Sequence, residues 1–346
     1  MTVARTVVIA YAGALLLQTV QHLLWPQRDG MLAIAQVGAP HLFAPLVVLL
    51  PAALVMRRRA LLAVVAVAAL VGALRFGPAM IALPPGVPAA HAPLHVATWN
   101  LAAGEASARD VVDRLLASDA EVVALPELTP PHAFAIEASP ELRARFPHRL
   151  LAPHHGVLGM GLLSAHPLRE RQRSTDPPHI LAELQAPSGP PIVTLAAHPL
   201  PPRFGLAGGA LPVGYAAEGR DHDLAHLRSM FEHHLAAGRP VLVLGDLNVT
   251  DREVAYGEFT AGLVDSHRRV GVGPGSTWRP LRLSALPLGI LRIDYVLTGG
   301  PLEPLSISTE CTPATGDHCI VWATLALLGQ AAGPEASAPP LALGAP

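Results

Sequence analysis

Apolar and polar positions divide this chain into two parts that meet near residue 90. The first part holds three long apolar runs, over residues 3–25, 31–56 and 60–74, separated only by short charged segments. The first two runs are long enough to cross a bilayer as helices, and the third becomes so when it is extended toward residue 81. The pattern predicts a membrane anchor of three transmembrane helices over residues 1–83. The alternatives are a cleaved signal peptide for the first run and buried helices of a soluble core for all three.

The second part, residues 94–328, alternates short apolar runs with segments of helical periodicity. Residues 108–116 and 221–235 each place apolar side chains on one helical face and polar side chains on the other. Surface helices interleaved with buried strands predict a layered α/β domain. Residues 199–219 are rich in glycine, proline and apolar side chains, and we expect them to form a loop over a site.

Two segments of biased composition flank this predicted domain. Residues 84–93 hold four prolines and predict a stiff, proline-rich spacer between the anchor and the first strand. Residues 329–346 consist mainly of alanine, proline and glycine, so we expect a disordered tail.

Composition and charge favour a membrane location. Hydrophobic residues make up 51% of the chain, which is too much for a purely soluble protein of this length. Residues 1–90 hold six arginines and one aspartate, whereas the rest holds 18 arginines and 25 acidic residues. Because positively charged loops stay in the cytoplasm, the triplet Arg57–Arg59 predicts that everything after about residue 80 lies outside it. The sequence thus predicts a multi-pass protein of the cell membrane with an extracytoplasmic domain.

This compartment bears on the cysteines and on the partners. Cys311 and Cys319 are the only cysteines; an oxidising compartment permits a disulfide between them, and two free buried thiols are an equal alternative. The acidic domain has no arginine stripe, which argues against nucleic acid as a partner. The bilayer itself is the predicted partner of the anchor.

Polar side chains stand at the ends of the short apolar runs. They are Asn100, Glu127, His198, Asp246 with Asn248, Asp294, and Asp317 with His318. A buried strand that ends in a hydrophilic residue presents that residue at the edge of a rigid sheet. Four carboxylates and two amides, without a cysteine or multi-histidine cluster, suit Mg²⁺ or Mn²⁺ rather than Zn²⁺. With two histidines beside them, they suit the attack of water on a phosphate.

Single residues of this set also have purely structural roles open to them. Asp294 could pair with Arg292 or Arg279, and Asn100 could cap the helix that follows it. Trp278 follows a segment rich in glycine and proline, where a tryptophan more often packs than contacts a substrate. Other chemistries are less well supported, because the chain has neither a GxSxG elbow nor a Walker loop.

The order of the motifs resembles the endonuclease/exonuclease/phosphatase superfamily over about residues 94–326. The matching segments are, in order, ATWNL, VVALPEL, GLLSAHPL, AAHPLPP, GDLN, TW, IDY and DH. Together with the N-terminal spans, they are similar to the membrane-anchored bacterial subgroup that includes VanJ-type teicoplanin-resistance and YafD-type proteins. Pro126 and Gly316 depart from the usual glutamine and serine, which puts a contact to the metal-binding glutamate in doubt.

The resemblance implies a four-layer α/β sandwich, with helices outside two central sheets, and metal-dependent cleavage of a phosphoester or phosphoanhydride. Glu127 would be the main metal ligand, with Asn100 and Asp317 nearby. His318, polarised by Asp294, would activate water or stabilise the attacked phosphate. The positions that would act on the nucleophile, the phosphate oxygens and the leaving group are Asp246, Asn248 and His198.

The predicted substrate is a phosphate at the membrane surface. An acidic domain held close to a bilayer, with an apolar segment after His198, suits a lipid phosphate or pyrophosphate better than a polymeric nucleic acid. The resemblance points toward a polyprenyl pyrophosphate. The alternatives are an extracytoplasmic nuclease or phosphodiesterase and a membrane-anchored scaffold without turnover.

Overall fold

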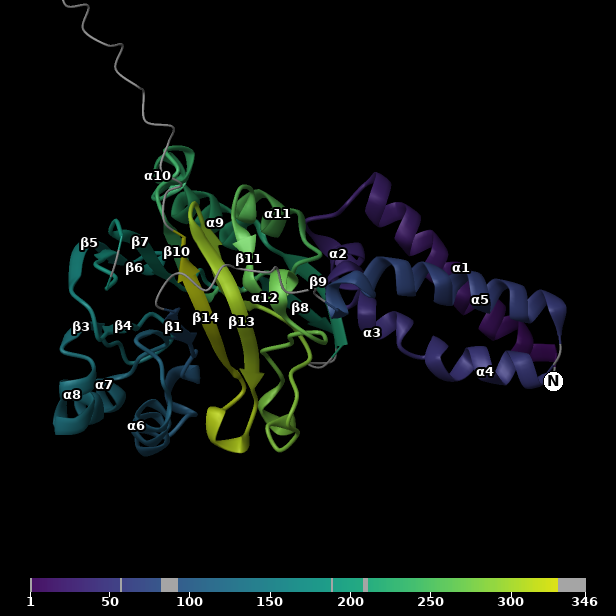
Figure 1. Ribbon diagram of the computed structural model, residues 1–346. Coiled ribbons are helices and arrows are strands. Elements are labelled where there is room, and N and C mark those ends of the chain that lie inside the picture. The colour runs from purple at the N-terminus through teal and green to yellow at the C-terminus, as the bar shows by residue number, and fades with distance from the viewer. Residues whose placement is uncertain (1, 57, 82–92, 188, 208–210, 329–346) are drawn as a thin grey trace, which may run out of the picture.

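A computed structural model describes residues 2–56, 58–81, 93–187, 189–207 and 211–328 of the chain (Figure 1). Within this part, a bundle of N-terminal helices joins one end of an α/β sandwich. The predicted tail and nearly all of the predicted spacer lie outside the described residues.

Two six-stranded sheets form the centre of the sandwich. The first sheet has the order β13 (Leu302–Glu310), β14 (Ile320–Leu327), β1 (Pro93–Thr98), β2 (Val122–Pro126), β4 (Met160–Ser164) and β3 (His148–Ala152). The second has the order β11 (Val264–Asp265), β12 (Asp294–Gly299), β10 (Val241–Asp246), β7 (Ile192–Ala197), β6 (Pro178–Leu184) and β5 (Leu168–Thr175). Both sheets are mixed, since β1 is parallel to β2 and antiparallel to β14, and β10 is parallel to β7 and antiparallel to β12.

Apolar side chains fill three layers of this sandwich. Val96 and Leu162 of the first sheet meet Ile180 and Leu242 of the second in the central layer. Outside the first sheet lie α6 (Ala108–Ala117), α7 (Pro130–Ala138) and α8 (Pro140–Arg145). Outside the second lie α9 (Glu218–Ser229), α10 (Glu232–Ala236) and α11 (Val254–Thr260), while α12 (Ser266–Val270) contacts β12 of the second sheet and β13 of the first. Figure 1 shows α6–α8 and α9–α11 on opposite sides of the sheets, which confirms the predicted four-layer sandwich.

The two predicted surface helices form, one of them with a break. Helix α6 begins after Ser107, whose hydroxyl accepts a hydrogen bond from the Asp110 amide, and it buries Val111 and Leu115 against the first sheet. The segment predicted as one helix over residues 221–235 is instead divided into α9 and α10. At the division the Ser229 hydroxyl donates to the carbonyl of residue 226, a side-chain bond that competes with the helical pattern.

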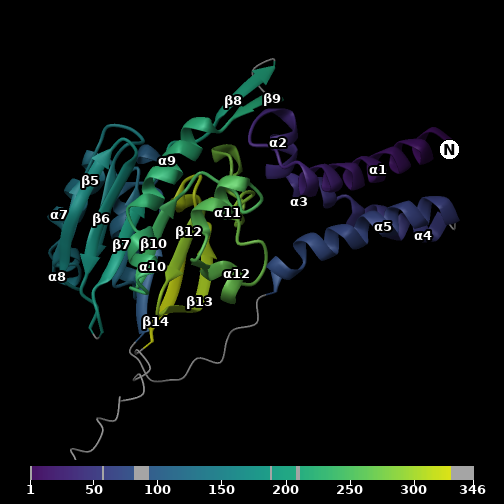
Figure 2. The ribbon, with the colours of Figure 1, turned by 90° about the horizontal axis from the view of Figure 1, so that it is seen from above.

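The predicted loop over residues 199–219 is wrong in part, because it contains a β-hairpin. Strands β8 (Arg203–Ala207) and β9 (Leu211–Ala216) pair antiparallel, with Phe204 opposite Tyr215 and their ring centroids 5.2 Å apart. Such an aromatic pair across two strands stabilises a hairpin that its glycines and prolines disfavour. The hairpin projects from the sandwich toward the N-terminal helices (Figure 2).

Three helical segments are long and apolar enough to cross a membrane, which agrees with the predicted number of spans. They are Val3–Leu24, Ala39–Met56 and Arg59–Phe76. The first and third are the single helices α1 (Thr2–Leu24) and α5 (Arg59–Phe76), whereas the second comprises α3 (Ala39–Phe43) and α4 (Leu46–Met56). Pro40 and Pro45 lack the backbone N–H that a continuous helix needs, which accounts for the interruptions around α3.

The second predicted span begins later than the apolar run suggests. Its first residues form a separate helix, α2 (Gly30–Val37), which packs on the hairpin through Ala33 and Val37 against Tyr215 and Ala217. Ala33 and Val37, which the sequence assigned to a membrane span, are therefore buried against the domain, whereas Met31 and Leu32 are exposed. Helix α2 therefore forms part of the interface between the anchor and the domain.

The loop between α1 and α2 is fixed to the sandwich by charge. Arg28 lies 3.1 Å from Asp221 and also pairs with Glu258, and Asp29 accepts a hydrogen bond of 2.7 Å from the Ala217 amide. The N-terminus and the junction of α4 with α5 lie at the opposite end of the bundle (Figures 1 and 2). All three candidate spans thus meet the domain with the same end of the bundle.

Candidate active site

The polar strand ends gather at one edge of the two sheets. Asp246 ends β10 and is the register partner of Asp294 at the start of antiparallel β12, and His198 follows β7, which is parallel to β10. Gly245 permits this close packing, because a Cβ there would lie 1.9 Å from the Ala197 carbonyl oxygen and its φ is +150°.

Asn100 joins the two sheets at this edge. Its Nδ2 donates hydrogen bonds of 3.0 Å to Glu127 Oε1, from the first sheet, and to Asp246 Oδ2, from the second. Its Oδ1 accepts a hydrogen bond of 2.8 Å from the Ala102 amide in an Asx turn, whereas Leu101 is the N-cap of the short helix that follows, so the suggested capping role is wrong. The buried amide therefore holds two carboxylates close together, and burial raises the pKa of both.

His318 and Asp294 form a buried hydrogen-bonded pair. His318 Nδ1 lies 3.0 Å from Asp294 Oδ2, and its Nε2 lies 3.7 Å from Asp246 Oδ2. Burial opposes the charged imidazolium, but Asp294 and Asp246 outweigh burial and raise the pKa of His318 to about 10. The ring is therefore protonated at neutral pH and can donate from both nitrogens.

The proposed ion pairs of Asp294 with arginine are wrong. Arg292 lies instead 2.8 Å from Asp251 and 2.7 Å from Asp265, and Arg279 donates to the Thr312 carbonyl. Asp294 therefore pairs with His318, as the resemblance to the family implied.

His198 is held in the opposite protonation state. Its Nδ1 lies 3.0 Å from the Val157 carbonyl oxygen, which can only accept, so Nδ1 carries the proton. Burial, with a smaller effect of His318, lowers its pKa to about 4. Its unprotonated Nε2 is buried 3.4 Å from Glu127 Oε1, without a hydrogen-bond partner in the part of the chain that the structure describes.

Thr277 and Trp278 position the acidic residues, a role that sequence reasoning missed. The Thr277 hydroxyl accepts from the backbone amides of Ile293 and Asp294, each at 3.1 Å. Trp278 Nε1 donates to Asp317 Oδ2 at 3.3 Å, and its side chain lines the same pocket. The Thr-Trp dipeptide was recognisable as a motif in the sequence. The sequence does not show, however, which backbone amides the threonine hydroxyl contacts.

A disulfide closes the loop that carries Asp317 and His318. Cys311 and Cys319 are bonded, which resolves the alternative of two free thiols. Gly316 within this loop has a φ of +75°, a conformation that suits the glycine found there in place of serine.

Removal of this disulfide should destabilise the loop and slow the enzyme. For a sequence separation of 8, loop-closure entropy gives a loss of about 2.5 kcal/mol in unfolding free energy for the double variant Cys311→Ser, Cys319→Ser. The measurements are the thermal unfolding midpoint and the rate of phosphate-ester hydrolysis, each with and without a reducing agent. A reducing agent should lower both values in the native chain and leave the double variant unchanged. Equal sensitivity of both proteins would contradict a structural disulfide.

A pocket of about 310 Å³ opens directly over this cluster. Its polar lining includes Glu127, Asp246, Asn248, Asp317 and His318. Its apolar lining comes from separate parts of the chain, with Val37, Val157, Pro201, Pro202, Phe204, Tyr215, Leu291 and Ile293. A mostly apolar pocket with a few convergent polar groups is the usual form of a small-ligand site.

Asn248 enters the pocket beside Asp246. Its backbone amide donates to Asp246 Oδ1 at 2.9 Å, and its side-chain Nδ2 donates to the Pro199 carbonyl at 3.0 Å. The residue has a positive φ of 49°, which turns the chain away from β10. The structure therefore brings all eight residues of the predicted site to one place.

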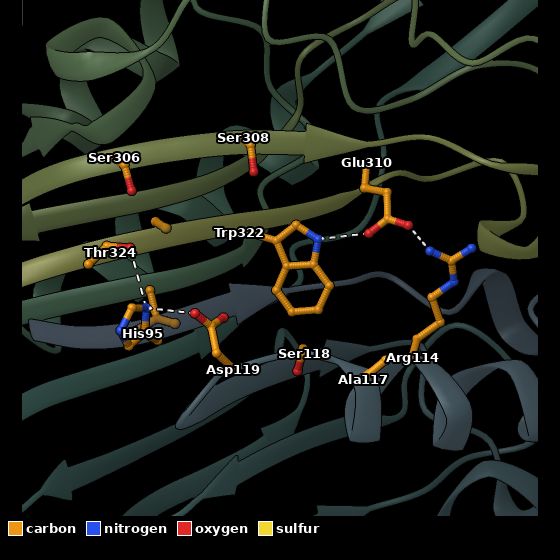
Figure 3. Close-up of a pocket in the computed structure, with 12 residues that line it drawn as sticks. His95, Arg114, Ala117, Ser118, Asp119, Ser306, Ser308, Glu310, Trp322 and Thr324 are labelled. Atoms are coloured by element: carbon orange, nitrogen blue, oxygen red, sulfur yellow. Dashed lines mark hydrogen bonds and ion pairs between the residues drawn. The ribbon is translucent and has the colours of Figure 1, made fainter.

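A larger cavity of about 630 Å³ lies elsewhere, on the outer face of β13 and β14 (Figure 3). Its charged groups pair with one another: Arg114 with Glu310, and His95 with Asp119 at 3.3 Å. The indole nitrogen of Trp322 also donates to Glu310. Because it contains none of the clustered carboxylates, this cavity is not the candidate active site.

The donor set at the polar cluster fits a divalent cation. Asp246, Asp294 and His318 offer ligand atoms within 4.8 Å of one another. A protonated imidazole has no free lone pair, however, so His318 is a poor ligand at neutral pH. Asp317 Oδ1 is buried without a hydrogen-bond partner among the described residues, and it faces the same pocket as Glu127. Carboxylate oxygens left free in this way are the ligands that hard cations prefer.

Carboxylates beside one neutral imidazole and one imidazolium, at the edge of a four-layer sandwich, are the groups of a hydrolase of phosphoester bonds. The sequence model described as the endonuclease/exonuclease/phosphatase family matches residues 97–318. The chain therefore belongs to the endonuclease/exonuclease/phosphatase family, as its motifs indicated.

Solved structures show the same fold. A humanised TDP2 of D. rerio matches with a TM-score of 0.51 and 16% identity, over 67% of this chain and 98% of that chain. D. rerio TDP2 complexed with a single-strand DNA product matches with a TM-score of 0.51 and 16% identity, over 68% and 99%. At such identity the likeness extends to the fold alone. A comparison with curated proteins gives no match.

Proposed function

We propose that this protein is a membrane-anchored, Mg²⁺- or Mn²⁺-dependent phosphohydrolase that cleaves the phosphoester or pyrophosphate of a membrane lipid such as a polyprenyl pyrophosphate. The observation that carries the proposal is the apolar wall of the pocket. Val37, from the helix next to the second candidate span, and Phe204 and Tyr215, from the hairpin packed on it, line the same pocket as the carboxylates. A substrate with a phosphate head and a hydrocarbon chain matches the polar and the apolar lining of this pocket.

Separate residues would hold the cation and stabilise the attacked phosphate. Glu127 and Asp317, with Asn100 nearby, would hold the cation, which neutralises charge that develops on the phosphate. Imidazolium His318, held by Asp294, donates to the phosphate oxygens and stabilises the attacked group.

The remaining three residues act on water and on the phosphate. Asp246 positions and deprotonates the attacking water, because its raised pKa makes it a stronger base than an ordinary aspartate. Asn248 binds phosphate oxygens. His198 has no proton at Nε2 to give to the leaving group, so there it accepts a hydrogen bond from a protonated phosphate oxygen or from water.

The anchor sets the location of this chemistry. With Arg57–Arg59 in the cytoplasm, the common end of the three candidate spans and the attached domain lie on the extracytoplasmic side of the cell membrane. The bilayer is then the source of the substrate, as in the subgroup with VanJ-type and YafD-type proteins that the chain resembles. A reporter fused after Pro93 should be active only outside the cytoplasm, and a cytoplasmic signal would overturn this orientation.

A substrate panel tests the proposal. The full chain in detergent with Mg²⁺ or Mn²⁺ should release phosphate from a polyprenyl pyrophosphate, and Asp246→Asn should abolish the release. Phe204→Ser, a change on a half-exposed wall residue, should lower kcat/KM for the lipid about tenfold, since it removes part of the apolar contact. The same variant should leave a water-soluble phosphate ester unaffected. Cleavage of DNA with lipids untouched would favour the nuclease alternative, and no turnover of any substrate would favour a scaffold.

A further inference from the structure

A second pocket, of about 180 Å³, lies where the anchor meets the domain. His22, in the last turn of α1, and Arg75, in the last turn of α5, form its anchor side. The domain side comes from the loop before α11, from α12 and from the residue two positions before β12, with Asp251, Arg252, His267, Arg268 and Arg292. None of these residues belongs to the catalytic cluster described above.

The pocket has more positive than negative charge. Asp251 is shared by three arginines, at 2.7 Å from Arg252, 2.8 Å from Arg292 and 3.3 Å from Arg268. Arg292 is in addition neutralised by Asp265, outside the pocket. Arg75 has no acidic partner in the part of the chain that the structure describes, and its Nη1 reaches only Gln18 and Thr19. Four arginines therefore face two aspartates, an excess of two positive charges.

Three buried nitrogen atoms in this pocket have no hydrogen-bond partner among the described residues. They are Arg75 Nη2, Arg252 Nε and His22 Nδ1. Buried donors rarely lack a hydrogen-bond partner, because an unpaired donor has lost its water without a bond in exchange. The two guanidinium nitrogens are donors only, so their missing partner is an acceptor, and the excess charge makes that acceptor an anion.

We infer that this pocket binds the phosphate of an anionic phospholipid headgroup. The ends of two candidate spans place it at the level where headgroups lie, and its excess of positive charge attracts the phosphate of an anionic lipid there. The carboxyl ends of α1 and α5 disfavour an anion, but this dipole effect is limited to the last turn and is smaller than the attraction of two unpaired charges. The lipid would connect anchor and domain at a point separate from the catalytic pocket.

The site is independent of the proposed function and can be tested without turnover. Native mass spectrometry of the full chain in detergent, after exchange with phosphatidylglycerol or phosphatidylcholine, should show one retained phosphatidylglycerol. The double variant Arg75→Gln, Arg252→Gln should reduce this retention by roughly 30-fold. Arg252→Gln alone changes a partly exposed side chain and should reduce the retention about fivefold. This single variant keeps the test valid if the double variant does not fold.

Matched controls distinguish this pocket from the charged surface and from the catalytic pocket. Arg171→Gln with Arg269→Gln removes two arginines from exposed surface ion pairs and should leave the retention unchanged. The variant His318→Ala should also keep the lipid, whereas its loss there would mean that the lipid occupies the catalytic pocket. Equal retention of phosphatidylcholine, or unchanged retention in the Arg75 and Arg252 variants, would overturn the inference. Displacement by inorganic phosphate would overturn the lipid assignment in favour of a soluble anion.

Discussion

Replacement of His318 by alanine is expected to lower the turnover of any phosphate-ester substrate by about 10³-fold. His318 is buried, its Nδ1 is fixed by Asp294, and its Nε2 points toward Asp246, where no other imidazolium is available among the described residues. Alanine removes the donor and leaves two buried carboxylates without their cationic neighbour. The measurement is kcat with the soluble ester and with the lipid, compared with the exposed control His222→Ala. A loss below tenfold would contradict a role of His318 in the chemistry.

The pKa values give this prediction a pH dependence. His198, with a pKa of about 4, is neutral and His318, with a pKa of about 10, is protonated across the range between them. Activity should therefore fall as the pH rises toward 10 and His318 loses its proton, and it should fall on the acid side as Asp246, whose pKa burial raises, gains one. In Asp294→Asn the strongest charge that raises the His318 pKa is gone, so the alkaline fall should begin at lower pH. An unchanged alkaline limit in this variant would show that another group titrates there.

The strand ends were predictable because the buried strands impose a simple rule. Each apolar run of strand length stops where the sheet meets solvent, so Asn100, Glu127 and His198 had to lie at sheet edges. Their convergence from two sheets depends on the strand order, which single runs do not show. The ordered motifs supplied that information through the resemblance to a family, and the contact of Asn100 with both Glu127 and Asp246 confirms it.

The wrong predictions concern segments whose sequence is compatible with two different structures. Residues 30–37 continue the apolar run of the second predicted span, but Ala33 and Val37 are buried against Tyr215 of the hairpin and the adjoining Ala217. The hairpin was itself missed, because its glycines and prolines favour a loop locally while the pair of Phe204 with Tyr215 favours strands. Each segment takes its structure from the other, and no local pattern contains that contact.

The same dependence on distant partners makes Arg292 critical for stability. Arg292 precedes Asp294 by two residues, its side chain is only 4% exposed, and it holds both Asp251 and Asp265. Arg292→Met is expected to lower the free energy of unfolding by about 3–5 kcal/mol, because it leaves buried Asp265 without its cationic partner and removes one of the three arginines that pair with Asp251. Arg269→Met, which breaks an exposed pair with Glu303, should cost no more than about 1 kcal/mol. The measurement is thermal or denaturant unfolding of the full chain in detergent.

Low pH should reduce the difference in unfolding free energy between the native chain and Arg292→Met. Burial alone would raise the pKa of Asp251 and of Asp265, but Arg292 outweighs burial and holds both below their usual range. Their contribution to stability is therefore complete above the unfolded pKa of about 3.9 and is lost as the pH falls through the folded values. In the variant the pKa of Asp265 rises, because Arg292 no longer offsets its burial, whereas Arg252 and Arg268 still pair with Asp251. Protonation of Asp265 in acid then relieves its uncompensated charge. The two unfolding curves should converge as the pH falls below about 4, and a constant gap down to the acid transition would contradict this origin of the stability.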